Sequence, residues 1–203
     1  MMNPDTTNNK LKFDELRNLL ECNRSIRRFD NARRISFDEI KEIVALARLC
    51  ASGRNAQPLK YRIVIERSEC REVYPLLAWA GYYKDWDGPE EAQQPVAYLV
   101  QCLDTEIAGN QLCDDGLQLE ALTLGAAAKG IGCCIIKAFN APALSRELGL
   151  GEHLQPLYVV AMGYPAETAK IVDLPADGDY KYFRNEADEQ CVPKRPAEDI
   201  IID

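Results

Sequence analysis

The chain has 203 residues, 47% of them hydrophobic and 28% charged, which is the size and composition of about one ordinary soluble domain. Its 24 basic and 32 acidic side chains leave a net charge of −8, which repels phosphate backbones and argues against a nucleic-acid partner. No apolar run approaches the roughly 20 residues of a membrane helix, and no basic-then-apolar leader is visible, so we expect a cytoplasmic protein with no membrane partner.

Two helices are predicted in the first fifty residues. Residues 1–10 are polar and are expected to be loose, and apolar residues then recur at helical spacing over 13–20. Ser36 and Glu39 have the spacing of a capping box, so a second helix is expected to begin there and to end near 52–53.

Strands and helices alternate through the rest of the chain. In chain order we predict a strand over 61–66, a helix over 68–80, a loop over 81–95, a strand over 96–103, a helix over 112–129, a short strand and turn over 130–140, a helix over 140–148 and a strand over 156–163. Residues 165–203 have little helical periodicity and cannot bury much of themselves, so we expect them to lie across another surface. Four strands alternating with five helices indicate a single α/β layer protein.

The eight cysteines and the single histidine predict no metal site. Only Cys133 and Cys134 are close in sequence, whereas zinc and iron–sulfur sites need paired ligands at short spacing. His153 is the only histidine. We interpret the cysteines as small buried side chains in a reducing cytoplasm.

The segment RSIRRF is the first candidate binding site. Arg24, Ser25 and Arg27 could present two guanidinium groups and a hydroxyl to one phosphate. A solvated basic loop is the alternative interpretation.

The segment ASGRNAQP is the second candidate. Ser52, Asn55 and Gln57 could hydrogen-bond the polar edge of a planar heterocycle, although a helix end followed by an ordinary turn has the same pattern. The chain has no G-x-S-x-G elbow, H-E-x-x-H motif or Walker loop, so an enzymatic reaction would depend on a cofactor.

Five motifs in the same order resemble the FMN-dependent nitroreductase family, over residues 13–203. They are RSIRRF, SGRNAQP, DDGLQLEALTLGAAAKGIGCCIIKAFN, MGYPAE and VPKRPAEDIII. The resemblance implies an α+β fold with a mainly antiparallel central sheet flanked by helices, in one domain spanning 1–203. It also implies an intertwined homodimer, in which the C-terminal arm, residues 165–203, crosses onto the other subunit and both FMN sites lie at the interface.

The resemblance also implies roles for twelve residues. Arg24, Ser25 and Arg27 would bind the FMN phosphate and ribityl chain; Ser52, Asn55 and Gln57 would contact the isoalloxazine or ribityl groups; Ile135, Ile136, Lys137 and Ala138 would run along the flavin; Lys194 and Arg195 would complete the phosphate site. No catalytic side chain is implied, because the flavin carries the reaction.

The implied function is an FMN-dependent oxidoreductase that uses NADH or NADPH to reduce nitroaromatics, quinones or related small oxidants by a ping-pong mechanism. Three positions depart from the family pattern: Asn23 stands where an arginine is frequent, Arg54 adds a cation beside the flavin, and Ala138 replaces a frequent glycine. A flavin storage or sensor protein without turnover, and a specialised member acting on one metabolite, remain alternatives. The aromatic loop 79–88 is either a substrate lid or a surface loop folded onto the core.

Overall fold

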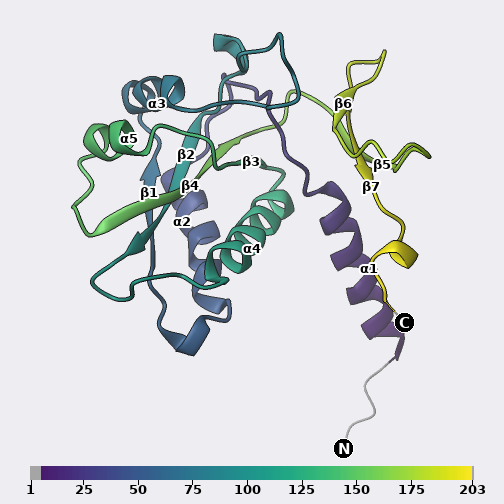
Figure 1. Ribbon diagram of the computed structural model, residues 1–203, viewed down its shortest axis with the longest axis horizontal. Helices are drawn as coiled ribbons and strands as arrows, with labels where there is room; N and C mark the ends of the chain where they lie inside the picture. Colours follow the sequence, from purple (N-terminus) through teal and green to yellow (C-terminus); the bar gives the residue numbers. More distant parts are fainter. Residues whose placement is uncertain (1–5, 203) are drawn as a thin grey trace, which may run out of the picture.

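The computed structural model describes residues 6–202, and its centre is a four-stranded sheet (Figure 1). The strands are β1 (Leu59–Val64), β2 (Ala97–Asp104), β3 (Gly132–Ile136) and β4 (Leu154–Gly163), in the spatial order β1-β2-β4-β3. All three pairings are antiparallel. The α+β class with an antiparallel central sheet and flanking helices, which the resemblance implied, is therefore confirmed.

One crossover explains why the alternation of strands and helices had pointed to an α/β protein. α4 (Asp114–Ala128) leads from β2 to β3, and these two strands run in the same direction because both are antiparallel to β4. β4 lies between them, so β2 and β3 are not partners. Helices thus alternate with strands along the chain while each hydrogen-bonded pair of this sheet is antiparallel.

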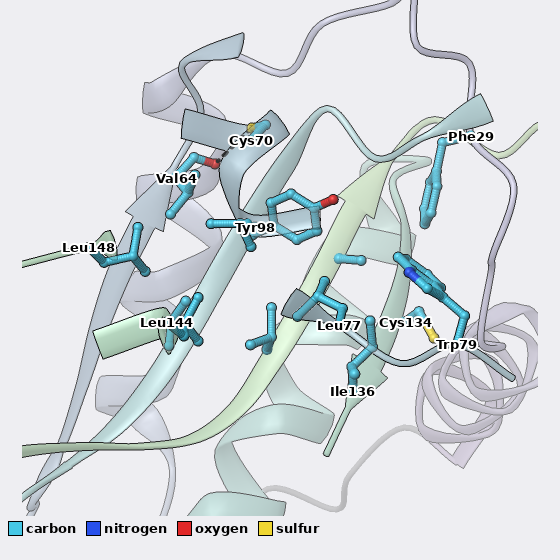
Figure 2. Close-up of a cluster of buried hydrophobic side chains, with 14 of the residues drawn as sticks. Phe29, Val64, Cys70, Leu77, Trp79, Tyr98, Cys134, Ile136, Leu144 and Leu148 are labelled. Atoms are coloured by element: carbon cyan, nitrogen blue, oxygen red, sulfur yellow. Dashed lines mark hydrogen bonds between the residues drawn. The ribbon is translucent and has the colours of Figure 1, made fainter. Parts of the chain in front are cut away.

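Helices cover both faces of the central sheet. Successive side chains of β2 point to opposite faces, so the strand contributes to a hydrophobic cluster on each side. On one face Tyr98 packs in a cluster with side chains of α3 (Arg67–Val73) and α5 (Ala141–Glu147), and Figure 2 shows this cluster. On the other face Leu99 packs in a second cluster with side chains of α2 (Phe37–Ala45) and α4. The strand is buried along its whole length as a result.

Side-chain caps mark the first turns of α2 and α5. The predicted capping box is present at α2: the Glu39 N–H donates to Ser36 Oγ at 3.2 Å, and the Ser36 N–H donates to the Glu39 carboxylate at 2.8 Å. The Asn140 side chain caps α5 in the same way. α3 differs from the prediction, because it begins before Ser68 and gives way to a 3₁₀ turn that contains Pro75.

α1 (Thr6–Cys22) begins earlier than the apolar spacing predicted. Residues 6–10 are helical rather than loose, and residues 1–5 lie outside the described part of the chain. Leu11, Phe13 and Leu16 keep 49–64% of their surface exposed. α1 lies beside the C-terminal segment (Figure 1), so much of its apolar face has no cover among residues 6–202.

The C-terminal segment from residue 165 onward forms a small second sheet that the sequence did not predict. β5 (Ala169–Asp173) pairs in parallel with β7 (Gln190–Lys194), and β6 (Phe183–Arg184) pairs antiparallel with β7. The order is β5-β7-β6, and Gln190 is fully buried. The segment therefore buries part of itself within one chain.

Short 3₁₀ turns complete the described structure. They span Leu46–Leu49, Gly53–Asn55, Tyr74–Leu76, Glu91–Gln93 and Ala197–Asp199. Across residues 6–202, the helices are all too short or too polar to cross a bilayer.

Candidate functional site

A cavity of about 260 Å³, here called the arginine cavity, brings together five of the twelve predicted residues: Arg24, Ser25, Arg27, Ile135 and Lys194. The segment RSIRRF, residues 24–29, is here called the arginine segment. The other lining residues lie on α4, on β3, in the C-terminal segment and directly before the arginine segment: Asn23, Glu120, Thr123, Cys133, Tyr182 and Val192. Segments far apart in the sequence thus meet around one space.

Two apolar side chains anchor the arginine segment beside the sheet. The Ile26 N–H donates to the Cys133 carbonyl at 2.9 Å, which places Ser25 next to β3. Ile26 and Phe29 are both buried, and each packs against a glycine. A Cβ at Gly132 would lie 2.8 Å from Ile26 Cγ1, and a Cβ at Gly163 would lie 2.8 Å from Phe29 Cδ1. Only glycine at these two positions lets the segment lie so close to β3 and β4.

Arg27 is the most constrained residue of the cavity. Only 8% of its surface is exposed, and its guanidinium carbon lies 4.3 Å from the centroid of the Tyr182 ring. One terminal guanidinium nitrogen of Arg27 and the Nε of Arg24 are buried with no hydrogen-bond partner in the described structure. A buried N–H of a cation without an acceptor is costly, so these two donors indicate an anionic ligand.

Glu167 fixes the arginine segment, and the sequence gave no role to this residue although it ends the MGYPAE motif. Its Oε1 accepts the backbone N–H groups of Arg27 and, at 3.2 Å, Arg28. Its Oε2 forms an ion pair with Arg184 of β6, and its side chain is almost completely buried. The carboxylate therefore joins the arginine segment to the C-terminal sheet while the Arg27 guanidinium stays available to the cavity.

A carboxylate also faces the arginine cavity. The Asn23 amide donates to Glu120 Oε1 at 3.2 Å and to Thr123 Oγ1 at 2.9 Å, both on α4. Asn23 is the position where the family often has an arginine. The negative charge of Glu120 thus opposes part of the positive charge that Arg24, Arg27 and Lys194 bring to the cavity.

Cys133 lines the cavity as a neutral thiol. Burial raises its pKa well above the usual range for cysteine, and burial raises the pKa of the neighbouring Cys134 to about 11. Neither is a reactive thiolate at neutral pH. Five of the eight cysteines are buried as expected, whereas Cys22 and Cys113 are exposed and Cys50 is partly buried, so the interpretation as buried side chains is wrong for these three.

The second predicted group, Ser52, Asn55 and Gln57, is not in the arginine cavity. Ser52 Oγ donates to Asp114 Oδ2 at 2.6 Å, and the Gly53 N–H donates to Asp114 Oδ1 at 2.8 Å. Asp114 is buried at the start of α4, so it fixes this loop against the helix. Asn55 and Gln57 are exposed and have positive φ angles of 56° and 53°.

The two predicted groups lie along different parts of α4. Glu120 and Thr123 follow Asp114 by six and nine residues, which is about 9 to 14 Å along the helix. Gly53 and Arg54 line a separate cavity of about 340 Å³ with residues 107–112, here called the loop cavity. Neither of these two cavities is lined by residues of both predicted groups.

The strand β3 brings only one of its predicted residues to the arginine cavity. Ile135 lines it, whereas Ile136 is buried in the core cluster of Figure 2. The Lys137 ammonium donates to the Leu157 carbonyl at 3.0 Å, and the Ala138 carbonyl accepts from the Ala78 N–H. These last two residues therefore interact elsewhere.

At the C-terminal end, Lys194 lines the arginine cavity and the exposed Arg195 follows it without lining it. Tyr182 lines the cavity too, although the sequence analysis gave it no role. The sequence signal that could have pointed to Tyr182 is its position in KYFRN, two residues before Arg184.

The aromatic loop 79–88 is tied to the same region. Trp79 is buried and lies 5.8 Å from the Tyr74 ring, so this residue belongs to the core. The Tyr83 hydroxyl donates to Gln190 Oε1 at 2.6 Å, and its ring lies 5.3 Å from Tyr182. Burial raises the pKa of Tyr83, which keeps the phenol protonated. The loop thus contacts the aromatic ring that covers Arg27.

Comparisons with known proteins agree on the fold. The sequence model of the Nitroreductase family matches residues 23–100 and 107–164. A nitroreductase family protein from Streptococcus pneumoniae is 17% identical with a TM-score of 0.66, and the match covers 93% of this chain and 99% of that one.

Two further solved structures are similar. An NADPH:FMN oxidoreductase from Vibrio harveyi, complexed with NAD⁺, is 21% identical with a TM-score of 0.62, over 79% of this chain and 73% of that one. A nitroreductase from B. subtilis is 22% identical with a TM-score of 0.63, over 80% and 72% of the two chains.

Proposed function

Because the chain belongs to the nitroreductase family, we propose that it is an FMN-dependent oxidoreductase that takes electrons from NADH or NADPH and reduces nitroaromatics, quinones or related small oxidants. The similar V. harveyi protein, an NADPH:FMN oxidoreductase, supports this choice of cofactor and donor. The observation that carries the proposal is the buried, unpartnered guanidinium nitrogen of Arg27 in the arginine cavity.

The residues of the arginine cavity fit a terminal phosphate. Arg27 and Arg24 each have one buried donor without an acceptor, and Ser25 and Lys194 line the same space. Together they offer charged and neutral donors to one phosphate, as phosphate sites require. Tyr182 and Glu167 would act as positioning residues, because they fix the side chain and the backbone of Arg27.

Bound FMN would supply the redox chemistry, accepting a hydride from the nicotinamide and delivering electrons to the oxidant. The residues of this chain would bind the phosphate, orient the ring and exclude water. Neither Cys133 nor Cys134 is ionised at neutral pH, so neither would act as a nucleophile. We therefore assign no catalytic side chain.

A homodimer is part of the proposal, because one chain does not bring Ser52, Asn55 and Gln57 to the arginine cavity. The exposed apolar face of α1 supports a second copy. Phe13, Leu16 and Leu20 line a groove of about 330 Å³ with Ile171 of the C-terminal sheet, here called the apolar groove. Apolar surface of this extent is typical of an interaction site.

The proposed location is the cytoplasm. All eight cysteines lie in the described residues, and all are free thiols. Free cysteines in this number are usual for a protein of a reducing compartment, which supports the proposal.

A flavin-binding protein without turnover is the second candidate, and Asn23 favours it. Asn23 replaces a frequent arginine and holds Glu120 at the cavity. The resulting phosphate site would be less positive and would bind FMN more weakly, which suits a protein that takes up and releases the flavin.

One experiment separates the two candidates. Flavin released by heat from the purified protein is identified by chromatography, and the protein reconstituted with FMN is mixed with NADH or NADPH and a quinone. We expect FMN to be released, and continuous oxidation of the nicotinamide to follow. FAD as the released flavin would contradict the phosphate site, and FMN binding without turnover would establish the storage candidate.

A further inference from the structure

Asp104, Glu106 and His153 form a cluster of metal-ligating side chains away from the arginine cavity. Their ligand atoms all lie within 4.8 Å of one another. Asp104 is the last residue of β2 and pairs with Leu154, the first residue of β4. His153 directly precedes β4, so the pairing of the two strands brings it to the turn that contains Glu106.

The carboxylate of Asp104 is buried without a cation. Asp104 keeps 8% of its surface exposed, and its Oδ1 accepts a hydrogen bond from the Glu106 N–H at 3.1 Å. None of the salt bridges found across residues 6–202 involves Asp104. No lysine or arginine of the described residues therefore offsets the charge of this mostly buried residue, and a bound cation would do so.

His153 is held in place from two sides. Its carbonyl accepts hydrogen bonds from the Thr105 N–H at 2.9 Å and from Thr105 Oγ1 at 3.0 Å. Its ring lies against Gly151, where a Cβ would be 2.6 Å from Cε1 and 2.8 Å from Nδ1. A larger residue at position 151 would therefore displace the ring from this position, while the two hydrogen bonds fix the backbone that carries it.

We propose that Asp104, Glu106 and His153 bind one divalent first-row transition-metal ion, with Zn²⁺ as the representative. One imidazole and two carboxylates form a nitrogen and oxygen donor set that suits such ions better than Mg²⁺ or Ca²⁺. Two ligand atoms of a tetrahedral zinc ion are about 3.4 Å apart. The observed limit of 4.8 Å therefore closes with a shift of up to about 1.4 Å, which the exposed Glu106 and the partly exposed His153 side chains can share.

No metal site was predicted here, because the sequence lacks paired cysteine and histidine ligands at short spacing. Two of the ligands proposed here are acidic, and the third, His153, lies far away in the sequence, directly before β4. The backbone pairing of β2 with β4 creates the cluster, and no local spacing encodes it.

The ion would act as a structural link beside the loop cavity. Residues 107–112, which line that cavity, follow directly after Glu106. One ion would join the end of β2, the start of β4 and this segment. The proposal concerns this link and does not depend on the identity of the flavin.

The single histidine makes a direct test possible. In the full-length protein, the imidazole proton resonances come from His153 alone, and ZnCl₂ is titrated while they are followed by NMR. We expect them to shift or broaden and to saturate at one equivalent. Glu106→Gln and His153→Ala should each weaken zinc binding at least about tenfold by equilibrium dialysis.

Glu152→Gln is the matched control, because it removes a neighbouring exposed carboxylate that is not in the cluster, and zinc binding should stay unchanged. Glu106→Gln changes an exposed side chain and should fold even if His153→Ala does not. Zinc that binds without moving the imidazole resonances, or binds equally well to Glu106→Gln, would overturn the proposal and assign the ion to cysteines.

Discussion

Arg27 combines burial, positive charge and a missing hydrogen-bond acceptor, which an ordinary surface arginine does not. We expect Arg27→Ala to weaken FMN binding by about 1.5–3 kcal/mol, the range for a hydrogen bond to a charged group. This is about a tenfold to hundredfold loss of affinity. Titration of the apo-protein by quenching of flavin fluorescence measures it.

Arg48→Ala is the control for this variant, because Arg48 is exposed at the end of a 3₁₀ turn and does not line the arginine cavity. Its flavin affinity should equal that of the wild type. Arg27→Lys keeps the charge but loses the forked donor, so it should fall between the two. Equal affinity for all four proteins would mean that Arg27 is a structural residue.

Glu120 lines the same cavity, where its negative charge would oppose that of the proposed phosphate. Glu120→Gln should therefore strengthen FMN binding by about threefold at low salt, and the gain should shrink as salt screens the charge. The measurement is the same flavin titration at two salt concentrations. A weaker affinity would show instead that the Asn23–Glu120 contact orders the site.

At the scale of elements, the capping box of α2 links helix stability to pH. Hydrogen bonds from Ser36 lower the pKa of Glu39 below its ordinary value of 4.5. The charged form of Glu39 is thus favoured in the folded state, and this contribution is present above pH 4.5 and is lost as the pH falls below it.

Ser36→Ala should cost about 1 kcal/mol of unfolding free energy at neutral pH, since the N-cap is lost. It should also make stability less dependent on pH below 4.5, because Glu39 loses the hydrogen bond that lowers its pKa most and keeps only the one from the backbone N–H of residue 36. Urea unfolding at pH 7 and pH 3.5 tests both effects. An equal loss at both pH values would mean that the carboxylate of Glu39 does not contribute.

Elements with local signals were predictable from the sequence. The Ser36–Glu39 spacing located α2, Asn140 located the start of α5, and β-branched runs located the four central strands. Strands β5 and β7 could not be predicted, because they pair in parallel across sixteen intervening residues, 174–189, that show no strand periodicity. β6 has only two residues, which is too short for any periodicity.

Part of the candidate site was predictable, because several of its residues belong to short sequence motifs. The motif residues Arg24, Ser25, Arg27 and Lys194 meet in one cavity, and this follows from their place in a family pattern. The role of Glu167 depends on its ion pair with Arg184, a contact across tertiary structure that no spacing reveals.

At the scale of the whole molecule, the apolar groove between α1 and the C-terminal sheet is the surface that a second copy would bury. We expect the double variant Phe13→Ser, Leu16→Ser to weaken dimerisation more than a hundredfold, because each buried side chain contributes about 1.5–3 kcal/mol. Sedimentation velocity over a range of protein concentrations measures the change.

Phe37→Ser is the matched control, because Phe37 is an exposed aromatic residue on α2, outside this groove. It should leave association unchanged. FMN affinity should fall together with dimerisation in the double variant, since the proposed site needs both copies. A double variant that stays dimeric would show that the groove is not the interface.

The order of strands in the central sheet has a consequence for the rate at which the protein folds. A helix separates the partners of each pair along the chain, so no pair is a hairpin and the sheet can form only by closing long loops. We expect the arginine cavity to form later still, because its walls come from segments near both ends of the chain. The proposed FMN would then bind only after the rate-limiting step, so stopped-flow measurements should find unfolding slowed by FMN and the folding rate unchanged.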